Sequence, residues 1–201
     1  MCAHFQTDFT NPEMMAAAKA AAQNGLPEDM SLMLKHKGEV FPGCIVPVMT
    51  APETFLPMEW GFPQAGKEVN YNARSEGAAE HPMFKEPMLR QRCVVPATGF
   101  YETWHKGSRE MKYFFRLPGS GIMYLAGCWK QERKRRYPVF TLLTREAVGN
   151  IADIHHRMPV LIQPERVAEW LCESPAPMKQ PVITLDYEPV WPEGSLFDPS
   201  G

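Results

Sequence analysis

The sequence predicts an α+β fold: a single β-rich domain with an antiparallel or barrel-like sheet and a few flanking helices. The chain has 201 residues, of which 44% are hydrophobic and 22% charged, enough for one substantial core. Short apolar runs separated by turn residues dominate its second half. Its 20 prolines remove backbone donors, so long uninterrupted elements are not expected. We therefore expect residues 1–201 to form one domain.

The first half begins with a helix signal. Asn11 can cap, Pro12 suits the first helical position, and an alanine-rich stretch runs to Asn24-Gly25. Between residues 39 and 59, β-branched residues are broken up by four prolines, which favours short edge strands and turns. Residues 61–90 lack sustained periodicity and are expected to form loops.

The second half contains the strand signals. Apolar runs occur at residues 93–95, 113–115, 122–126, 139–143 and 160–162, each bounded by turn residues. Pro164 then opens a second helix, in which Val167, Trp170 and Leu171 share a face. Residues 173–201 are proline-rich, and we expect a mostly irregular C-terminal tail.

Composition excludes several classes of protein. A formal charge of −2 gives no global attraction for nucleic acid, so any polyanion must meet a local patch. No apolar run is long enough to span a membrane and no secretory signal is present, so we expect a cytoplasmic protein that is not bound to membranes. Five cysteines without a C-x-x-C pair favour reduced thiols over disulfides or a metal site.

One near-match to a phosphate-binding loop covers Gly61–Glu68. It fails because Glu68 stands where a Ser or Thr would bind magnesium, and because Pro63 removes a backbone donor. The following residues also do not resemble a helix. We therefore expect neither a nucleotide cofactor nor any other cofactor.

Cys2 directly follows the initiator methionine. Removal of Met1 would leave a 1,2-aminothiol, whose amine condenses with an aldehyde to an imine and whose sulfur then closes a thiazolidine. Ordinary pKa values of about 8 for the amine and about 8.5 for the thiol leave reactive fractions near neutrality. Position alone favours an inert terminal residue, so the reactive interpretation depends on further segments.

Three further segments combine reactive side chains with turns or apolar runs. Tyr71–Glu76 carries Asn72 and Arg74, where a guanidinium could hold a phosphate. Arg92–Glu102 indicates a buried strand, a corner and a carboxylate flanked by aromatics, which favours a protonated Glu102. Asp153–Pro159 contains two adjacent histidines, of which at most one faces a site. Taken singly, each segment is also compatible with an ordinary turn or strand.

In this order, Cys2 and the three segments resemble the SOS response-associated peptidase (SRAP) family, whose members process abasic sites and crosslink to DNA. The resemblance covers most of the chain, including Trp60-Gly61 and the block Ile154–Pro159. It implies an incomplete barrel, a positively charged groove for single-stranded DNA that contains abasic sites, and covalent capture of the ring-opened sugar. It also implies self-removal of the residue before the cysteine. We expect a monomer.

The resemblance also implies roles for individual residues. Cys2 would be the nucleophile, Asn72 would position the sugar, Glu102 would be the general acid or base, and His155 would move a proton at the sugar hydroxyl. The DNA contacts implied are His4, Trp60, Arg74, Trp104 and Arg157. The chain departs from the family pattern in having Ala3 and His4 where the family has Gly and Arg, and Thr103 between Glu102 and Trp104.

Two other functions remain open from the sequence. One is a noncovalent single-strand binding module that has lost crosslinking, and the other is a cysteine peptidase that uses Cys2 with His155. Lys130, Arg133, Lys134, Arg135 and Arg136 form a dense basic cluster. We interpret it as a solvated hairpin tip, with an accessory DNA contact as the alternative.

Overall fold

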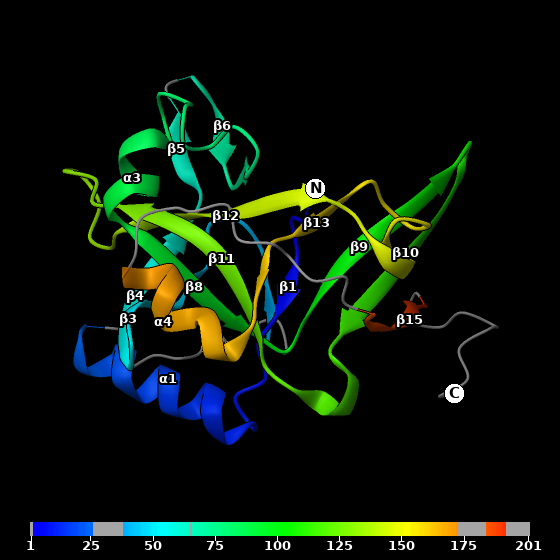
Figure 1. Ribbon diagram of the computed structural model, residues 1–201, viewed down its shortest axis with the longest axis horizontal. Coiled ribbons are helices and arrows are strands. Elements are labelled where there is room, and N and C mark those ends of the chain that lie inside the picture. Colours follow the sequence, from blue (N-terminus) through cyan, green and yellow to red (C-terminus); the bar gives the residue numbers. More distant parts are fainter. Residues whose placement is uncertain (1, 26–37, 65, 173–183, 192–201) are drawn as a thin grey trace.

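The computed structural model describes residues 2–25, 38–64, 66–172 and 184–191, and all structural statements below refer to these residues. They form two main β-sheets with three short helices (Figure 1). The prediction of a β-rich single domain is confirmed. A long hairpin extends away from the main body of the molecule (Figure 1).

The long hairpin belongs to a five-stranded antiparallel sheet. Its strand order is β15 (Asp186–Val190), β10 (Arg109–Arg116), β9 (Gly99–Lys106), β1 (Phe5–Gln6) and β2 (Glu39–Val40). The turn Gly107-Ser108 joins β9 to β10 and sets a register in which Thr103 lies opposite Lys112. Strand β1 lies along β9, with Phe5 opposite Phe100, and so brings the N-terminal residues beside β9.

The larger sheet is partly closed. Its order is β13 (Arg157–Pro159), β12 (Val139–Glu146), β4 (Thr54–Trp60), β3 (Ile45–Ala51), β8 (Arg92–Ala97), β11 (Met123–Lys130) and β14 (Leu161–Ile162). Strand β12 also pairs with β11, which brings distant members of this order together. The predicted antiparallel arrangement holds for most pairs, but β12 runs parallel to β4 and to β7 (Asn72–Arg74).

The helices cover the larger sheet. Helix α1 (Pro12–Gln23) begins and ends where the sequence predicts, because the Asn11 side chain accepts hydrogen bonds from the N–H groups of Glu13 and Met14. It packs on β3 and β4. Helix α4 (Val167–Cys172) follows a 3₁₀ turn at Pro164–Arg166 and packs on β8 through Val167 and Trp170. Helix α3 (Lys85–Arg90) is a short third element.

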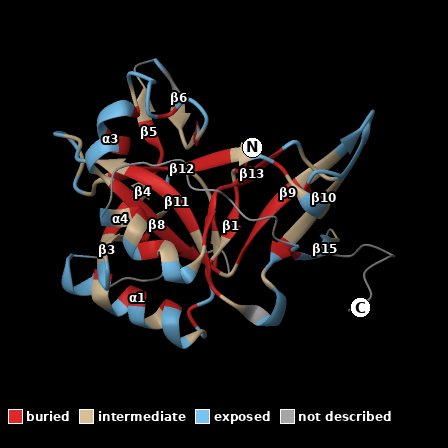
Figure 2. Ribbon diagram, viewed as in Figure 1, coloured by how far each residue is buried: buried red, intermediate tan, exposed pale blue. Residues whose placement is uncertain are grey.

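The core lies inside the partly closed sheet, where buried ribbon is continuous from β1 through β8, β11 and β12 (Figure 2). Trp60 is the largest fully buried side chain, and its Nε1 donates to the Tyr71 carbonyl at 2.8 Å. Phe5 packs on its ring. The N-terminal segment is therefore held by the core.

Two expectations about the first half are wrong. Strands β3 and β4 are interior members of the larger sheet, although the prolines suggested edges. Pro47 lies opposite Pro57, and the outer neighbours pair with β3 and β4 at other residues, so the missing donors interrupt no pairing there. Residues 61–90 contain β5 (Phe62–Gln64), β6 (Lys67–Asn70), β7 and α3 in addition to loops.

The proposed C-terminal tail is described only at residues 184–191, where β15 pairs with β10. Residues 173–183 and 192–201 lie outside the described part of the chain.

Candidate functional site

Cys2 lies at the start of the segment that β1 anchors to β9. The Tyr101 N–H donates to the His4 carbonyl at 2.9 Å, and Phe5 pairs with Phe100. The Cys2 side chain is fully buried, and its Sγ lies 3.6 Å from the His4 carbonyl oxygen. The two residues of β1 pair with β9, the strand that carries Glu102, and this pairing places Cys2 next to that strand.

Asn72 holds Cys2 from the other side. Its Nδ2 donates to the Cys2 carbonyl oxygen at 2.7 Å, across 70 residues of sequence. Asn72 begins β7, which pairs in parallel with β12 opposite Leu142. The Oδ1 atom of Asn72 is buried and has no hydrogen-bond partner among the described residues. One end of this amide therefore positions the cysteine, and the other end is available to a ligand.

Glu102 is a buried carboxyl group on β9. Burial raises its pKa to about 7, because the charged form loses its hydration. Burial also raises the pKa of the Cys2 thiol strongly, and the negative charge of Glu102 raises it further. The cysteine is therefore a neutral thiol near pH 7 that needs a proton acceptor, whereas Glu102 populates both of its protonation states.

His155 lies beside Glu102. Its Nδ1 is 3.7 Å from Glu102 Oε2. The same Nδ1 lies 3.0 Å from both the backbone N and the carbonyl O of Arg157, so the backbone fixes the ring, and the tautomer decides which bond forms. Burial lowers the pKa of His155, which favours the neutral ring. A carboxyl group and an imidazole thus share one site.

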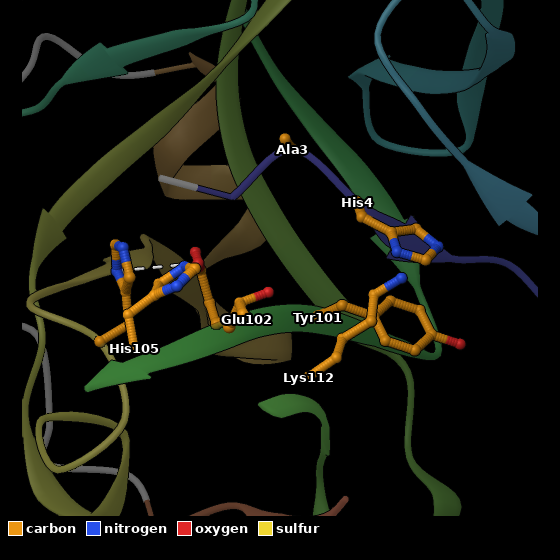
Figure 3. Close-up of a pocket in the computed structure, with 8 residues that line it drawn as sticks. Ala3, His4, Tyr101, Glu102, His105 and Lys112 are labelled. Atoms are coloured by element: carbon orange, nitrogen blue, oxygen red, sulfur yellow. Dashed lines mark ion pairs between the residues drawn. The ribbon is translucent and has the colours of Figure 1, made fainter. Parts of the chain in front are cut away.

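A pocket of about 190 Å³ opens over these groups (Figure 3). It is lined by Ala3, His4, Tyr101, Glu102, Thr103, His105, Lys112 and His155. Figure 3 shows His4, Tyr101 and Lys112 gathered near one end and Glu102 and His105 toward the other. The pocket therefore joins a cationic end to an acid and base end.

His4 is neutral in this setting. Its ring stacks between Phe41 and Tyr101, with centroid distances of 4.2 and 3.8 Å. Burial, followed by the positive charge of Lys112, lowers the pKa of His4 to about 3. His4 therefore lines the pocket without contributing a charge, and Lys112 contributes one.

Arg74 lies on a separate hollow of about 390 Å³. Asn72, Arg74, Glu76, His81 and Phe84 are among the residues that line it. Arg74 is exposed, and Asn72 lies between this hollow and Cys2. Asn72 thus connects the cysteine to a surface that carries an exposed guanidinium.

Comparison with known proteins assigns the family. The family model described as "SOS response associated peptidase (SRAP)" matches residues 1–190. The chain belongs to the SRAP family.

Several curated relatives are named abasic site processing proteins. YoaM of Bacillus subtilis (strain 168) is 35% identical over 125 residues, which are 57% of this chain and 55% of YoaM. YedK of Escherichia coli (strain K12) is 28% identical over 178 residues, 85% of this chain and 79% of YedK. HMCES of Gallus gallus is 25% identical, covering 70% of this chain and 54% of HMCES. The chain thus spans about half the length of several relatives.

Solved structures share the SRAP fold of this chain. A protein from Bacteroides thetaiotaomicron has a TM-score of 0.74 at 20% identity, covering 94% of this chain and 92% of that one. A protein from Bordetella bronchiseptica has a TM-score of 0.72 at 21% identity, covering 94% and 100%.

The four residues to which the SRAP resemblance gives catalytic roles converge in the structure. Asn72 donates to the Cys2 carbonyl, Glu102 raises the pKa of the Cys2 thiol by its charge, and His155 lies 3.7 Å from Glu102. Of the residues implied as DNA contacts, Arg74 is exposed, Trp104 is half-buried on β9, and His4 lines the pocket.

Trp60 and Arg157 are buried within the protein. Trp60 is fully buried, so its ring cannot stack on a base in this conformation. Arg157 is buried and makes a bidentate pair with Glu76 at 2.8 and 2.9 Å, while its Nη2 also donates to the Thr144 carbonyl at 2.6 Å. We therefore do not keep these two residues as DNA contacts. The Arg157–Glu76 pair ties two of the SRAP motif segments together.

Sequence reasoning missed Lys112, Thr103 and His105. The last two share β9 with Glu102, and Lys112 faces Thr103 across the hairpin. Gly107-Ser108 indicates a two-residue turn between two strands. The length of such a turn fixes which residues of the two strands pair, so the pairing of Lys112 with Thr103 follows from the turn. A hairpin assignment would therefore have placed a lysine in the pocket.

The near-match to a phosphate-binding loop and the basic cluster lie outside this pocket. The residues of the near-match to a phosphate-binding loop contribute to the β5–β6 hairpin, with no helix to receive a phosphate. The basic cluster lies at the turn between β11 and β12, where Lys130 pairs with Glu132 and Arg135 with Glu59. Within the described ranges, no group of three or more His, Cys, Asp or Glu side chains is arranged to bind a metal ion, and no helix is long and apolar enough to cross a membrane.

Proposed function

We propose that the chain senses and shields abasic sites in single-stranded DNA by forming a covalent crosslink through Cys2. The observation that carries this proposal is the hydrogen bond from Asn72 to the Cys2 carbonyl, next to a pocket that Glu102 and His155 line together. The names of the SRAP relatives support the substrate class. We further propose that the protein acts as a cytoplasmic monomer.

The proposed chemistry begins after hydrolysis of the peptide bond between Met1 and Cys2. The free amine of Cys2 adds to the aldehyde carbon C1′ of the ring-opened sugar, and loss of one water gives an imine. The thiol then adds to the same carbon: sulfur forms the C–S bond, and its proton passes to the imine nitrogen. The product is a thiazolidine, and no oxidant or cofactor is consumed.

Glu102 supplies both proton transfers that this sequence needs. Because its pKa is about 7, a protonated fraction can donate to the departing water. The resulting carboxylate can then accept the proton of the Cys2 thiol, which burial keeps protonated. Donation to water leaves Glu102 as a carboxylate, and acceptance of the thiol proton returns it to the acid form.

His155 and Asn72 serve the sugar and the nucleophile. A neutral imidazole next to Glu102 can relay a proton at the sugar hydroxyl during ring opening. Asn72 fixes the Cys2 carbonyl, and its unpartnered Oδ1 can accept a hydrogen bond from the sugar. Arg74, beside Asn72 on the surface, can hold a flanking phosphate.

The same residues can remove Met1 without another enzyme. The Cys2 thiol adds to the Met1 carbonyl carbon, and Glu102 can take the thiol proton. The C–N bond to Cys2 then breaks, the proton passes to the freed amine, and water hydrolyses the resulting thioester to release methionine. This gives the peptidase character of the proposal, limited to the chain's own terminus.

Mass spectrometry and a denaturing gel test the proposal. Protein whose intact mass shows loss of Met1 is incubated with a single-stranded oligonucleotide that contains one abasic site. We expect a denaturation-resistant adduct whose mass equals protein plus oligonucleotide minus one water. Cys2→Ala should abolish the adduct, whereas Cys44→Ala and Cys172→Ala, at two other free cysteines, should retain it.

Two outcomes would replace the proposal. An adduct that persists in Cys2→Ala would show that another nucleophile reacts. Reversible binding to undamaged single strands without any adduct would indicate the noncovalent module instead. Turnover of an added peptide would be required for a general cysteine peptidase.

A further inference from the structure

A larger hollow of about 620 Å³ lies directly beside the candidate active pocket. It is lined by Thr103, His105, Glu110, Met111, Lys112, Val190 and Trp191. Thr103, His105 and Lys112 line both the hollow and the pocket. The two spaces are therefore neighbours along the β9–β10 hairpin, on the side where β15 pairs with β10.

The lining of the hollow combines apolar side chains with one lysine. Met111, Val190 and Trp191 are the apolar side chains that line the hollow, and an aromatic ring such as that of Trp191 is a group on which a base can stack. Its volume exceeds that of the active pocket about threefold. Such a space suits a whole nucleotide, whereas the smaller pocket suits a sugar without a base.

Lys112 stands between the two spaces. Among the described residues that line them, it is the only lysine or arginine. Its Nζ lies 4.9 Å from the centre of the Tyr101 ring. A cation shared by two adjacent pockets can hold the phosphate that links two adjacent nucleotides. Glu110 also lines the hollow, with its Oε2 3.8 Å from His105 Nδ1, and it disfavours a phosphate at that end.

We propose that this hollow binds the nucleotide next to the abasic sugar, with the bridging phosphate on Lys112 and the base against Trp191 and Met111. This inference rests on the proposed function, because it assigns the active pocket to the abasic sugar. It names a base-stacking subsite that the comparisons do not assign.

Binding of an unreactive abasic analogue separates this inference from crosslinking. A tetrahydrofuran analogue has no aldehyde, so binding is measured without an adduct. Three single-stranded probes are used, with the analogue in the interior, at the 5′ end or at the 3′ end. Each terminal probe lacks the neighbour on one side of the abasic position.

Trp191→Ala should weaken binding of the interior probe and of one terminal probe by about tenfold. It should leave the other terminal probe unchanged, because that probe has no nucleotide for the hollow. Met111→Ala should weaken binding of the same two probes by a smaller factor. Because Met111 lies on β10, this variant shows whether the effect of Trp191→Ala comes only from a disturbed β15.

Lys112→Gln should weaken the interior probe and make the slope of log affinity against log salt shallower by about 0.7, the value for one single-strand phosphate contact. Lys112→Arg should restore the slope. Lys106→Gln, on the same hairpin but outside both spaces, is the matched control and should match the wild-type chain.

The inference is overturned if Trp191→Ala weakens both terminal probes equally or weakens none, or if the wild-type chain binds none of the probes. If the adduct still forms when one of these results is found, the proposed function stands and the proposed subsite is wrong. If no adduct forms but Trp191→Ala still weakens only the interior probe and one terminal probe, the subsite stands and the proposed crosslinking function is wrong.

Discussion

At the scale of single residues, the site depends on a carboxyl group whose protonation changes near neutrality. Glu102 should act as an acid during imine formation, and burial raises its pKa to about 7. Its acid form therefore decreases as the pH rises through 7.

Glu102→Gln should slow adduct formation by about 10²-fold near pH 6, in line with general acid catalysis. Glutamine does not titrate, so the ratio of wild-type to variant rates should fall as the pH rises from 6 to 8. Single-turnover adduct rates across this range measure the ratio, on wild-type and variant protein whose intact masses both show loss of Met1. A constant ratio would contradict the role of Glu102 as the acid.

Thermal melts of the same two proteins provide the control. Because the pKa of Glu102 is raised on folding, the folded state binds its proton more tightly than the unfolded state. The resulting stabilisation is complete below pH 4.5 and is lost as the pH rises toward 7. The variant should lack this pH-dependent contribution.

At the candidate site, the sequence indicates the burial of Glu102 but not the burial of Trp60 or Arg157. Glu102 was inferred from its aromatic flanks, and it is buried as expected. Trp60 and Arg157 carry groups typical of DNA contacts, but packing determines whether such groups reach the surface. The bidentate partner of Arg157, Glu76, is 81 residues away, and no local pattern reveals that pairing.

At the scale of elements, strand β9 carries the site and starts at a glycine with no room for a side chain. A Cβ atom on Gly99 would lie 2.3 Å from Phe114 Cζ and 2.6 Å from the Phe115 carbonyl oxygen. The backbones of β9 and β10 approach closely there because residue 99 lacks a side chain.

Gly99→Ala should therefore destabilise the protein by about 1–3 kcal/mol, a typical cost of overpacking. It should also slow adduct formation, because β9 must move to relieve the contact. Chemical denaturation measures the first effect. Gly77→Ala, where a Cβ atom meets nothing within 4 Å, is the control. Equal stability of the two variants would contradict the expected close approach.

The elements that the sequence predicted best have local causes. Helix α1 has its own cap and composition, and β8, β11 and β12 lie at predicted apolar runs bounded by turns. The interior position of β3 and β4 was missed because tolerance of proline depends on which residues the neighbouring strands pair with. That information is in the assembled sheet and not in either strand.

At the scale of the whole molecule, the Arg157–Glu76 pair joins β13 to the segment after β7. The Arg157 side chain is 9% exposed and that of Glu76 is 53% exposed, so solvent screens the pair from one side only. The hydrogen bonds from Arg157 lower the pKa of Glu76 to about 2.

Glu76→Gln should lower stability near pH 7 by about 1–2 kcal/mol, because it weakens the partner of a buried guanidinium. The contribution of Glu76 is present above pH 4.5 and is lost as the pH falls toward 2, since its pKa is lowered on folding. Denaturation curves from pH 7 to pH 3 should therefore converge for the two proteins. Curves that stay parallel would contradict this assignment. Glu86→Gln, at an exposed pair on α3, is the control and should change stability little.

The hydrogen bond from Asn72 to the Cys2 carbonyl has a practical consequence for anyone who produces this protein. Cys2 is fully enclosed and held by a residue from the middle of the chain, so it is unlike a frayed terminus. A purification tag fused ahead of Cys2 would acylate the amine on which the proposed chemistry depends. Recombinant material for activity assays should therefore carry any fusion partner elsewhere.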